Sequence, residues 1–205
     1  MTFEGFQPKD FDTFAIEGLD ERMEAIQERI QPKFQVIGDA LADDLSQLVG
    51  QEMHLHIAKH ARRTVNPPDD TWMALAANKR GYKKHPHFQV GLWQDHLFIW
   101  LAYIYEFENK TTVAQQFLQD QDDIETNIPN DFVLSLDHTK NQSMPFTNEN
   151  LSHALDRLKN VKKAEFLIGK NIDRHNPILQ DGDKLLQEIK QTFDTLAPLY
   201  RSTIK

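Results

Sequence analysis

Nine consecutive apolar residues, from Leu97 to Tyr105, form the longest apolar run of the chain. The run is too short to cross a membrane, which takes about 20 residues. It also lacks the alternation of polar and apolar residues that is typical of a strand with one face in water. A strand that is covered on both faces has such a continuous apolar sequence. We therefore predict that 96–107 contains a central, buried strand of a sheet.

Two helices are predicted before the first strand. Between residues 23 and 48, apolar residues recur every three or four positions, which is the period of a helix stripe. Proline suits the first turn of a helix and breaks its interior, so Pro32 divides this segment into helices over about 19–31 and 32–49. Gly50 is a stop signal. Four aromatic residues ahead of these helices are expected to pack onto the core: Phe3, Phe6, Phe11 and Phe14.

From Met53 the apolar period changes to two, which is typical of half-buried strands. Strands are predicted over 53–60, 71–77, 88–92, 96–107, 131–137 and 165–170. Further helices are predicted over 111–121, from Thr147 onward, and over 183–200. This order predicts an α+β fold, with a mostly antiparallel sheet of about six strands packed by N-terminal, middle and C-terminal helices. No repeat or linker divides the chain, so 1–205 is expected to be a single domain.

Several function classes are excluded by what the sequence lacks. The chain has no cysteine, which excludes disulfides, zinc–thiolate sites, iron–sulfur clusters and cysteine nucleophiles. The motifs G-x-x-x-x-G-K-[ST], G-x-G-x-x-G, G-x-S-x-G and H-E-x-x-H are also absent. The eight glycines do not cluster, so a glycine-rich phosphate cradle is not expected. P-loop NTPases, kinases, Rossmann dehydrogenases and α/β-hydrolases therefore do not fit.

The N-terminal segment 1–14 has neither the basic stretch nor the apolar stretch of a signal peptide. Together with the short length of the longest apolar run, this predicts a cytoplasmic protein with no membrane partner.

Charge is distributed unevenly along the chain. The net charge is −8, which favours solubility and disfavours general binding to nucleic acid. Segment 54–87 runs against this trend, because it has seven basic and two acidic residues and five of the nine histidines. An acidic chain with a single basic segment is expected to have one positively charged place on its surface.

Parts of the sequence resemble a known family. They are HIAKHARRTVNPPDDTW (56–72), NKRGYKKHPHFQVGL (78–92), HLFIWLAYIYE (96–106) and the opening pattern FxxxDFxxFxIxGLxxRM (6–23). The chain is similar in these parts to the YktB-like bacterial proteins, which are grouped as a domain of unknown function. The resemblance extends over nearly the whole chain and implies a compact cytosolic α+β protein. It implies no activity, substrate or catalytic residue.

Segment 54–87 also contains the residues that are best suited to bind a ligand. Guanidinium groups match the geometry of phosphate, lysines add positive charge, and aromatic rings can stack on nucleic-acid bases. We predict a protein that binds a phosphorylated ligand. The ligand is a nucleotide, another phosphorylated small molecule or a nucleic acid. The candidate ligand-binding residues are His56, Lys59, His60, Arg62, Arg63, Trp72, Lys79, Arg80, Tyr82, Lys83 and His87.

Whether these residues converge depends on topology. If strands 53–60 and 71–77 pair antiparallel, the loop with Arg62 and Arg63 lies at one end of the sheet. The loop with Lys79 to Lys84 then leaves from the opposite end, unless it folds back. A purely structural interpretation also stands beside the functional one, in which the aromatic residues belong to the core and the arginines pair with acidic residues elsewhere.

The histidines and carboxylates of this region raise the question of a metal. His54 and His56 are two apart on a predicted strand, so both point to the same face, and His85 and His87 have the same spacing. No third ligand stands at a suitable distance in sequence, so we predict no metal and no cofactor. Asp69 and Asp70 could provide a base or a magnesium ligand, but turn formation explains them as well.

Two alternatives to simple ligand binding remain open at this point. One is an enzyme that acts on a phosphorylated substrate with a histidine as general acid or base. The other is a protein-interaction module without a small-molecule site. The sequence determines neither whether the protein is an enzyme nor its oligomeric state.

Overall fold

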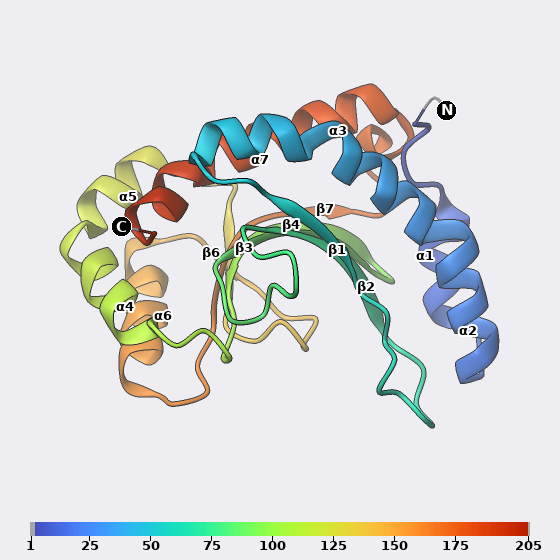
Figure 1. Cartoon of the computed structure of the whole chain (residues 1–205), viewed down its shortest axis with the longest axis horizontal. Coiled ribbons are helices and arrows are strands. Elements are labelled where there is room, and N and C mark those ends of the chain that lie inside the picture. The colour runs from blue at the N-terminus through green and yellow to red at the C-terminus, as the bar shows by residue number, and fades with distance from the viewer. Residues whose placement is uncertain (1–2, 205) are drawn as a thin grey trace.

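A computed structural model describes residues 3–204 as a seven-stranded sheet with helices packed on one face (Figure 1). All neighbouring strands pair antiparallel, in the order β1-β2-β3-β4-β7-β5-β6. The predicted α+β class and mostly antiparallel sheet are thus confirmed. The strands are β1 His54–Ile57, β2 Asp70–Ala76, β3 His87–Trp93, β4 His96–Tyr103, β5 Val133–Ser135, β6 Met144–Pro145 and β7 Phe166–Asp173.

The apolar run forms the centre of this sheet. Strand β4 is the fourth of the seven strands and pairs with β3 on one side and with β7 on the other. Every residue from Leu97 to Tyr103 is buried, which confirms the predicted central strand. The strand ends at Tyr103 rather than at 107, although Ile104 and Phe107 are also buried.

Helices from both ends of the chain lie together over one face of the sheet (Figure 1). Helices α4, α5 and α6 form a separate group at one end of the molecule (Figure 1). The helices are α1 Pro8–Asp12, α2 Leu19–Ala25, α3 Gln31–Val49, α4 Lys110–Gln119, α5 Gln121–Asn127, α6 Asn148–Asn160 and α7 Gly182–Ser202, with 3-10 turns at Thr13–Ala15 and Pro177–Gln180.

Pro32 divides the N-terminal helices as predicted, but the chain does not leave the helical path. One π-helical segment, Ile26–Ile30, joins α2 to α3. Pro32 lies in the first turn of α3, where its missing N–H leaves no hydrogen bond unmade. The four phenylalanines of the N-terminal segment are buried in the main core, which confirms their predicted role.

The structure corrects the predicted boundaries in several places. The helix predicted over 111–121 ends at Gln119, and α5 follows it after Asp120. Helix α5 has only Ile124 as a buried residue, so its sequence carries no helix stripe. Strand β6 has only two residues, which are too few to show an apolar period of two. With β6 the sheet has seven strands, where about six were predicted.

Alternation along the strands gives the sheet two different faces. One face packs under α3 and α7 in the main core, with residues such as Leu75, Val90 and Ile168. The other face has no helix packed on it (Figure 1) and is covered in part by loops. We call it the loop face, and it carries a smaller apolar cluster of Trp72, Trp93, Phe98, Trp100, Ala102, Ile104, Val133 and Leu167.

Among residues 3–204, no helix combines the length and the apolar character that crossing a membrane requires.

We propose that the chain is one folding unit, because the first and last long helices, α3 and α7, pack on each other over one sheet. Thermal unfolding is then expected to show one transition, with equal calorimetric and van't Hoff enthalpies. Differential scanning calorimetry measures both. Two resolved transitions would show that the chain holds two units.

Candidate functional site

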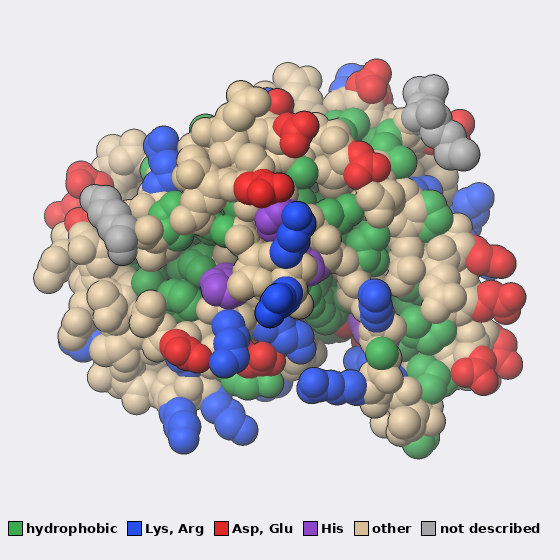
Figure 2. All heavy atoms as spheres, in the orientation of Figure 1, with side chains coloured by type: hydrophobic (Ala, Val, Ile, Leu, Met, Phe, Trp, Pro, Cys, Tyr) green, Lys and Arg blue, Asp and Glu red, His purple; other side chains and the backbone are tan. Residues whose placement is uncertain are grey.

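Two loops cover the loop face near β1 and β2. One joins β1 to β2 and spans 58–69, and the other joins β2 to β3 and spans 77–86. The second loop folds back along the face, so that Trp72 Nε1 donates a hydrogen bond to the Tyr82 hydroxyl at 3.0 Å. The two basic loops therefore converge, which the sequence left open. In Figure 2, Lys and Arg side chains gather with His side chains at the lower centre of the molecule.

A cavity of about 450 Å³ lies between the two loops, and we call it the loop cleft. Volumes of roughly 300–1,000 Å³ are typical of small-molecule sites. A second cavity, of about 630 Å³, continues from it and shares four of its lining residues, Lys59, Tyr82, Lys83 and Glu106. The loop cleft is lined by Ala58, Lys59, His60, Ala61, Arg62, Arg63, Trp72, Tyr82, Lys83 and Glu106.

Nearly all predicted ligand-binding residues line these two cavities. Seven of them line the loop cleft, and three of these seven, Lys59, Tyr82 and Lys83, also line the second cavity. His56 and Arg80 line the second cavity alone. Lys79 is exposed and lines neither. His87 lies behind Tyr82, with ring centroids 4.9 Å apart, and is fully buried. It lines neither cavity.

A buried arginine fixes the shape of the first loop. Arg22 of α2 donates to the carbonyl oxygens of Ile16 at 2.8 Å and Pro68 at 2.9 Å, and it pairs with Asp69 at 3.3 Å. Within the loop, Arg63 donates to the carbonyl oxygens of Asn66 and Pro67. The loop therefore has a defined conformation, and Asp69 serves in holding it.

The cations of the loop cleft are only partly neutralised. Lys83 lies 3.7 Å from the carboxylate of Glu106. Within the described part of the chain, Lys59, Arg62 and Arg63 form no ion pair with a carboxylate. Four basic side chains thus face one acidic side chain in the cleft.

Two histidines near the cleft, His60 and His87, are held neutral. Burial, and then the positive charge of Arg63, lower the pKa of His60 to about 4. Burial lowers the pKa of His87 to about 3. His87 Nδ1 donates to the carbonyl oxygen of His85 at 2.8 Å, and its Nε2 accepts from the Gln89 amide at 2.9 Å. At neutral pH these two rings add no positive charge, so the attraction for an anion comes from the lysines and arginines.

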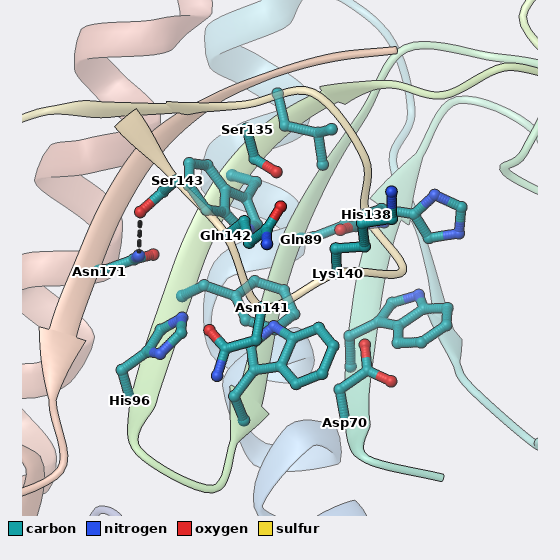
Figure 3. A pocket seen from close by; sticks show the side chains of 15 residues that line it. Asp70, Gln89, His96, Ser135, His138, Lys140, Asn141, Gln142, Ser143 and Asn171 are labelled. Atoms are coloured by element: carbon teal, nitrogen blue, oxygen red, sulfur yellow. Dashed lines mark hydrogen bonds between the residues drawn. The ribbon is translucent and has the colours of Figure 1, made fainter. Parts of the chain in front are cut away.

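A narrow inner crevice continues from Trp72 along the loop face, beneath the segment 140–143 (Figure 3). Its volume of about 20 Å³ is enough for about one water molecule. Asp70 and His138 lie on one side of the crevice, and His96 and Asn171 on the other (Figure 3). Trp72 is the one described residue that lines both the inner crevice and the loop cleft.

His138 is held in place by a buried carboxylate. Glu165 accepts hydrogen bonds from the backbone N–H of Tyr105 at 3.1 Å, from the backbone N–H of His138 at 2.7 Å and from His138 Nδ1 at 2.8 Å. The imidazole stands edge-on to the Trp72 ring, with centroids 6.1 Å apart. Burial acts to lower the pKa of His138, but the hydrogen bond and charge of Glu165, with the charges of Asp70 and Asp137, raise that pKa above its ordinary value.

Asp70 is the other titratable group of the inner crevice. It is the first residue of β2 and faces the same side of the sheet as Trp72. Burial raises the pKa of Asp70 to about 7, although the positive charges of His138 and Arg63 act in the opposite direction. At neutral pH the carboxyl group therefore exchanges readily between its two protonation states.

Asp137, His138 and Glu165 place possible metal-ligand atoms within 4.8 Å of one another, the one such group of three among residues 3–204. Hydrogen bonds account for this grouping. His138 Nδ1 donates to Glu165, and Asp137 accepts from the N–H and hydroxyl of Thr139. We assign no cation here. His54 and His56 do not belong to the group, and His56 Nε2 donates to the carbonyl oxygen of Asn78 at 2.8 Å.

Residues 6–200 match DUF1054, a family described as a domain of unknown function. The chain belongs to this family. It is 60% identical to UPF0637 protein OB1420 of Oceanobacillus iheyensis over 98% of this chain and 97% of that protein. It is 54% identical to UPF0637 protein ABC2405 of Shouchella clausii, over 100% of this chain and 97% of that protein. These matches confirm the resemblance seen in the sequence motifs.

The sequence did not reveal the pair of His138 and Glu165. The two residues are 27 positions apart and meet only through the pairing of strands near the sheet centre. The sequence around Glu165 shows only that it directly precedes a run of four residues without charge. The sequence indicates Asp70 as a possible base, but the burial of Asp70 depends on the fold.

Proposed function

We propose that the loop cleft binds a small phosphorylated ligand that carries an aromatic ring, as a nucleotide does. The phosphate contacts Arg62, Arg63 and Lys83, and the ring packs against Trp72 and Tyr82. The observation that carries this proposal is that both basic loops line one cavity together with these two aromatic side chains.

Charge and shape both favour this class of ligand. Guanidinium groups form paired hydrogen bonds with phosphate oxygens, and hydrogen bonds between ionised groups are about twice as strong as neutral ones. The cleft holds four cations against one carboxylate. The remainder of the chain is strongly acidic and repels a long polyanion, so a compact ligand fits better than an extended nucleic acid.

The test is a thermal-shift screen with AMP, ATP, ribose 5-phosphate, inorganic phosphate and a thymidine decanucleotide, followed by titration of the compounds that raise the melting temperature. The double variant Arg62→Ala, Arg63→Ala is expected to bind the best nucleotide at least about a hundredfold more weakly, since a hydrogen bond between charged groups contributes about 1.5–3 kcal/mol. Isothermal titration calorimetry gives the dissociation constants.

The matched control is Lys9→Ala, Arg29→Ala. It removes the same charge from two exposed residues that line neither cavity, and it should bind nucleotide as the parent chain does. The dependence of affinity on salt concentration separates the ligand classes. If the protein neutralises four phosphates of a nucleic acid, a plot of log affinity against log salt concentration has a slope of about −3 to −4. The proposal fails if no phosphorylated compound binds, or if the arginine variant and the parent chain bind equally well.

A further inference from the structure

We propose that the outer edge of β1 binds an extended acidic segment of a partner protein, which adds a strand to the sheet. The segment occupies the second cavity, the one of about 630 Å³, rather than the loop cleft. This inference goes beyond the proposed function and does not require a nucleotide to bind. We call the surface the β1 edge; it consists of the backbone of Leu55 and Ile57 and the side chains of Lys59, Arg80, Lys83 and Lys84.

Strand β1 is the first strand of the sheet and pairs only with β2 (Figure 1). The Ala58 N–H donates to the carbonyl oxygen of Trp72 at 2.9 Å, in the same register that places His56 opposite Ala74. In an antiparallel pair, hydrogen-bonded positions alternate with positions whose N–H and C=O groups point away from the partner strand. The positions that point away from β2 are Leu55 and Ile57.

The four backbone groups of Leu55 and Ile57 have no partner among residues 3–204. No hydrogen bond to the N–H or C=O of either residue is found there, and both residues are only half-buried. The next carbonyl along the chain differs, because that of Ala58 accepts from the Gln31 amide at 3.2 Å. A row of unpaired N–H and C=O groups at a sheet edge is a template for a further strand.

The second cavity follows this edge. Leu55, His56 and Ile57 all line the cavity, although the side chains of successive strand residues point to opposite faces of a sheet. Three consecutive strand residues line one cavity when the cavity runs along the backbone. Its volume of about 630 Å³ lies within the range of roughly 300–1,000 Å³ that is typical of binding sites. The cavity therefore offers a bound strand both space and hydrogen-bonding groups.

The opposite edge of the sheet is protected against such pairing. Strand β6 has two residues, and one of them is Pro145, which has no N–H to donate. A short edge strand and a proline on the edge are two of the ways in which proteins prevent further strands from adding. Strand β1 has four residues and no proline. Of the two edges, β1 is thus the one that is open to another strand.

The charges beside the β1 edge determine which kind of strand can add. Lys83 and Lys84 lie 3.7 Å and 3.2 Å from glutamate carboxylates. Within the described part of the chain, Lys59 and Arg80 form no ion pair. Glu106 is the one carboxylate that lines the cavity with these four cations. A strand with Asp or Glu side chains complements this excess of positive charge.

The same charges disfavour a second copy of this chain as the occupant. If two β1 strands paired edge to edge, the basic side chains of both copies would lie along one seam. Like charges that meet across an interface repel, and charged side chains beside an edge strand protect it from pairing with itself. The partner is therefore a different protein with an acidic extended segment.

The probe is a fluorescein-labelled heptapeptide in which Glu and Val alternate, with a Lys and Val heptapeptide as control. Fluorescence anisotropy should show that the Glu peptide binds at least about tenfold more tightly. Two further peptides carry N-methyl groups on every Glu or on every Val. Because successive N–H groups of a strand point to opposite edges, only one of these two should lose affinity, by about tenfold or more. Equal affinities of the two methylated peptides would overturn the inference.

Hydrogen exchange followed by NMR locates the bound peptide on the sheet. In the free protein the amides of Leu55 and Ile57 should exchange faster than the amide of His56, which donates to β2. Saturating Glu peptide should slow the exchange of Leu55 and Ile57 at least about tenfold and leave His56 nearly unchanged. Unchanged exchange at Leu55 and Ile57 would contradict the inference. Protection of both amides in a dimer of the free protein, seen by sedimentation, would make the second copy the occupant and also contradict it.

Charge reversal separates the β1 edge from the loop cleft. Arg80 and Lys84 line the second cavity alone, so Arg80→Glu, Lys84→Glu should bind the Glu peptide at least about tenfold more weakly and bind nucleotide as the parent chain does. Lys9→Glu, Arg29→Glu is the matched control at exposed positions outside both cavities, and it should bind the peptide normally.

The double arginine variant of the loop cleft completes the comparison, because it should weaken nucleotide binding and leave peptide binding unchanged. Failure of nucleotide binding therefore leaves this inference standing, and failure of peptide binding leaves the proposed function standing. If Arg80→Glu, Lys84→Glu binds the Glu peptide as tightly as the parent chain, the charges of the β1 edge do not select the partner and the inference is wrong.

Discussion

Asp70→Asn is expected to stabilise the folded protein by up to about 4 kcal/mol above pH 7. Burial raises the pKa of Asp70 from 3.8 to about 7, so the folded chain binds this proton more tightly than the unfolded chain. The parent protein therefore loses stability as the pH rises from about 4 to about 7. Asparagine has nearly the same shape and no charge, so the variant avoids this loss.

Urea unfolding of both proteins between pH 4 and pH 8 measures the effect. The difference in free energy of unfolding should grow by about 1.4 kcal/mol per pH unit and level off above pH 7. The low pKa values of His60 and His87 destabilise both proteins in acid and cancel in the difference. Asp43→Asn, at an exposed position of α3 without an ion pair among the described residues, should change stability by less than about 1 kcal/mol. Equal stability of Asp70→Asn and the parent at pH 8 would contradict the prediction.

Gly169→Ala is expected to cost more than about 4 kcal/mol of the free energy of unfolding. A Cβ atom at Gly169 would lie 1.8 Å from the carbonyl oxygen of Ile99 and 3.0 Å from the Cα of Trp100. Both are backbone atoms of β4, which cannot yield without breaking the pairing of β4 with β7. The free energy of unfolding of a native domain is only about 5–15 kcal/mol, so the variant loses much of its stability.

Gly81→Ala is the matched control for this change. An added Cβ at Gly81 meets no atom within 4 Å, so its effect should stay within about 0.5 kcal/mol. Urea unfolding monitored by tryptophan fluorescence compares the three proteins. If Gly169→Ala unfolded at the same urea concentration as Gly81→Ala, β7 would have room that the structure does not show.

The fold was largely predictable because its long elements have regular patterns. The apolar run from Leu97 to Tyr105 identified the central strand. The spacing of apolar residues in 183–200 identified α7, whose Leu185, Ile189 and Phe193 are buried. Short elements could not be predicted in this way, because they have too few residues to show a pattern. Strand β6 is set by its pairing with β5 rather than by its own two residues.

The candidate site was predictable only in part, for a different reason. Composition indicated the basic segment, but the convergence of its two loops depends on tertiary contacts, such as those of Tyr82 with Trp72 and His56. The pair of His138 and Glu165 depends on tertiary structure even more. His138 reaches Glu165 because β5 pairs with β7, and nothing local to either residue encodes that pairing.

The strand order has a consequence for synthesis on the ribosome. The central strand β4 finds its second partner only in β7, which leaves the ribosome after β5, β6 and three helices. At about 5–20 residues per second, the roughly 60 residues between Tyr103 and Phe166 take several seconds to make. During that interval the most apolar edge of the nascent chain has no partner of its own. A chain that stalls or is cut before β7 thus presents an edge that pairs readily with other chains.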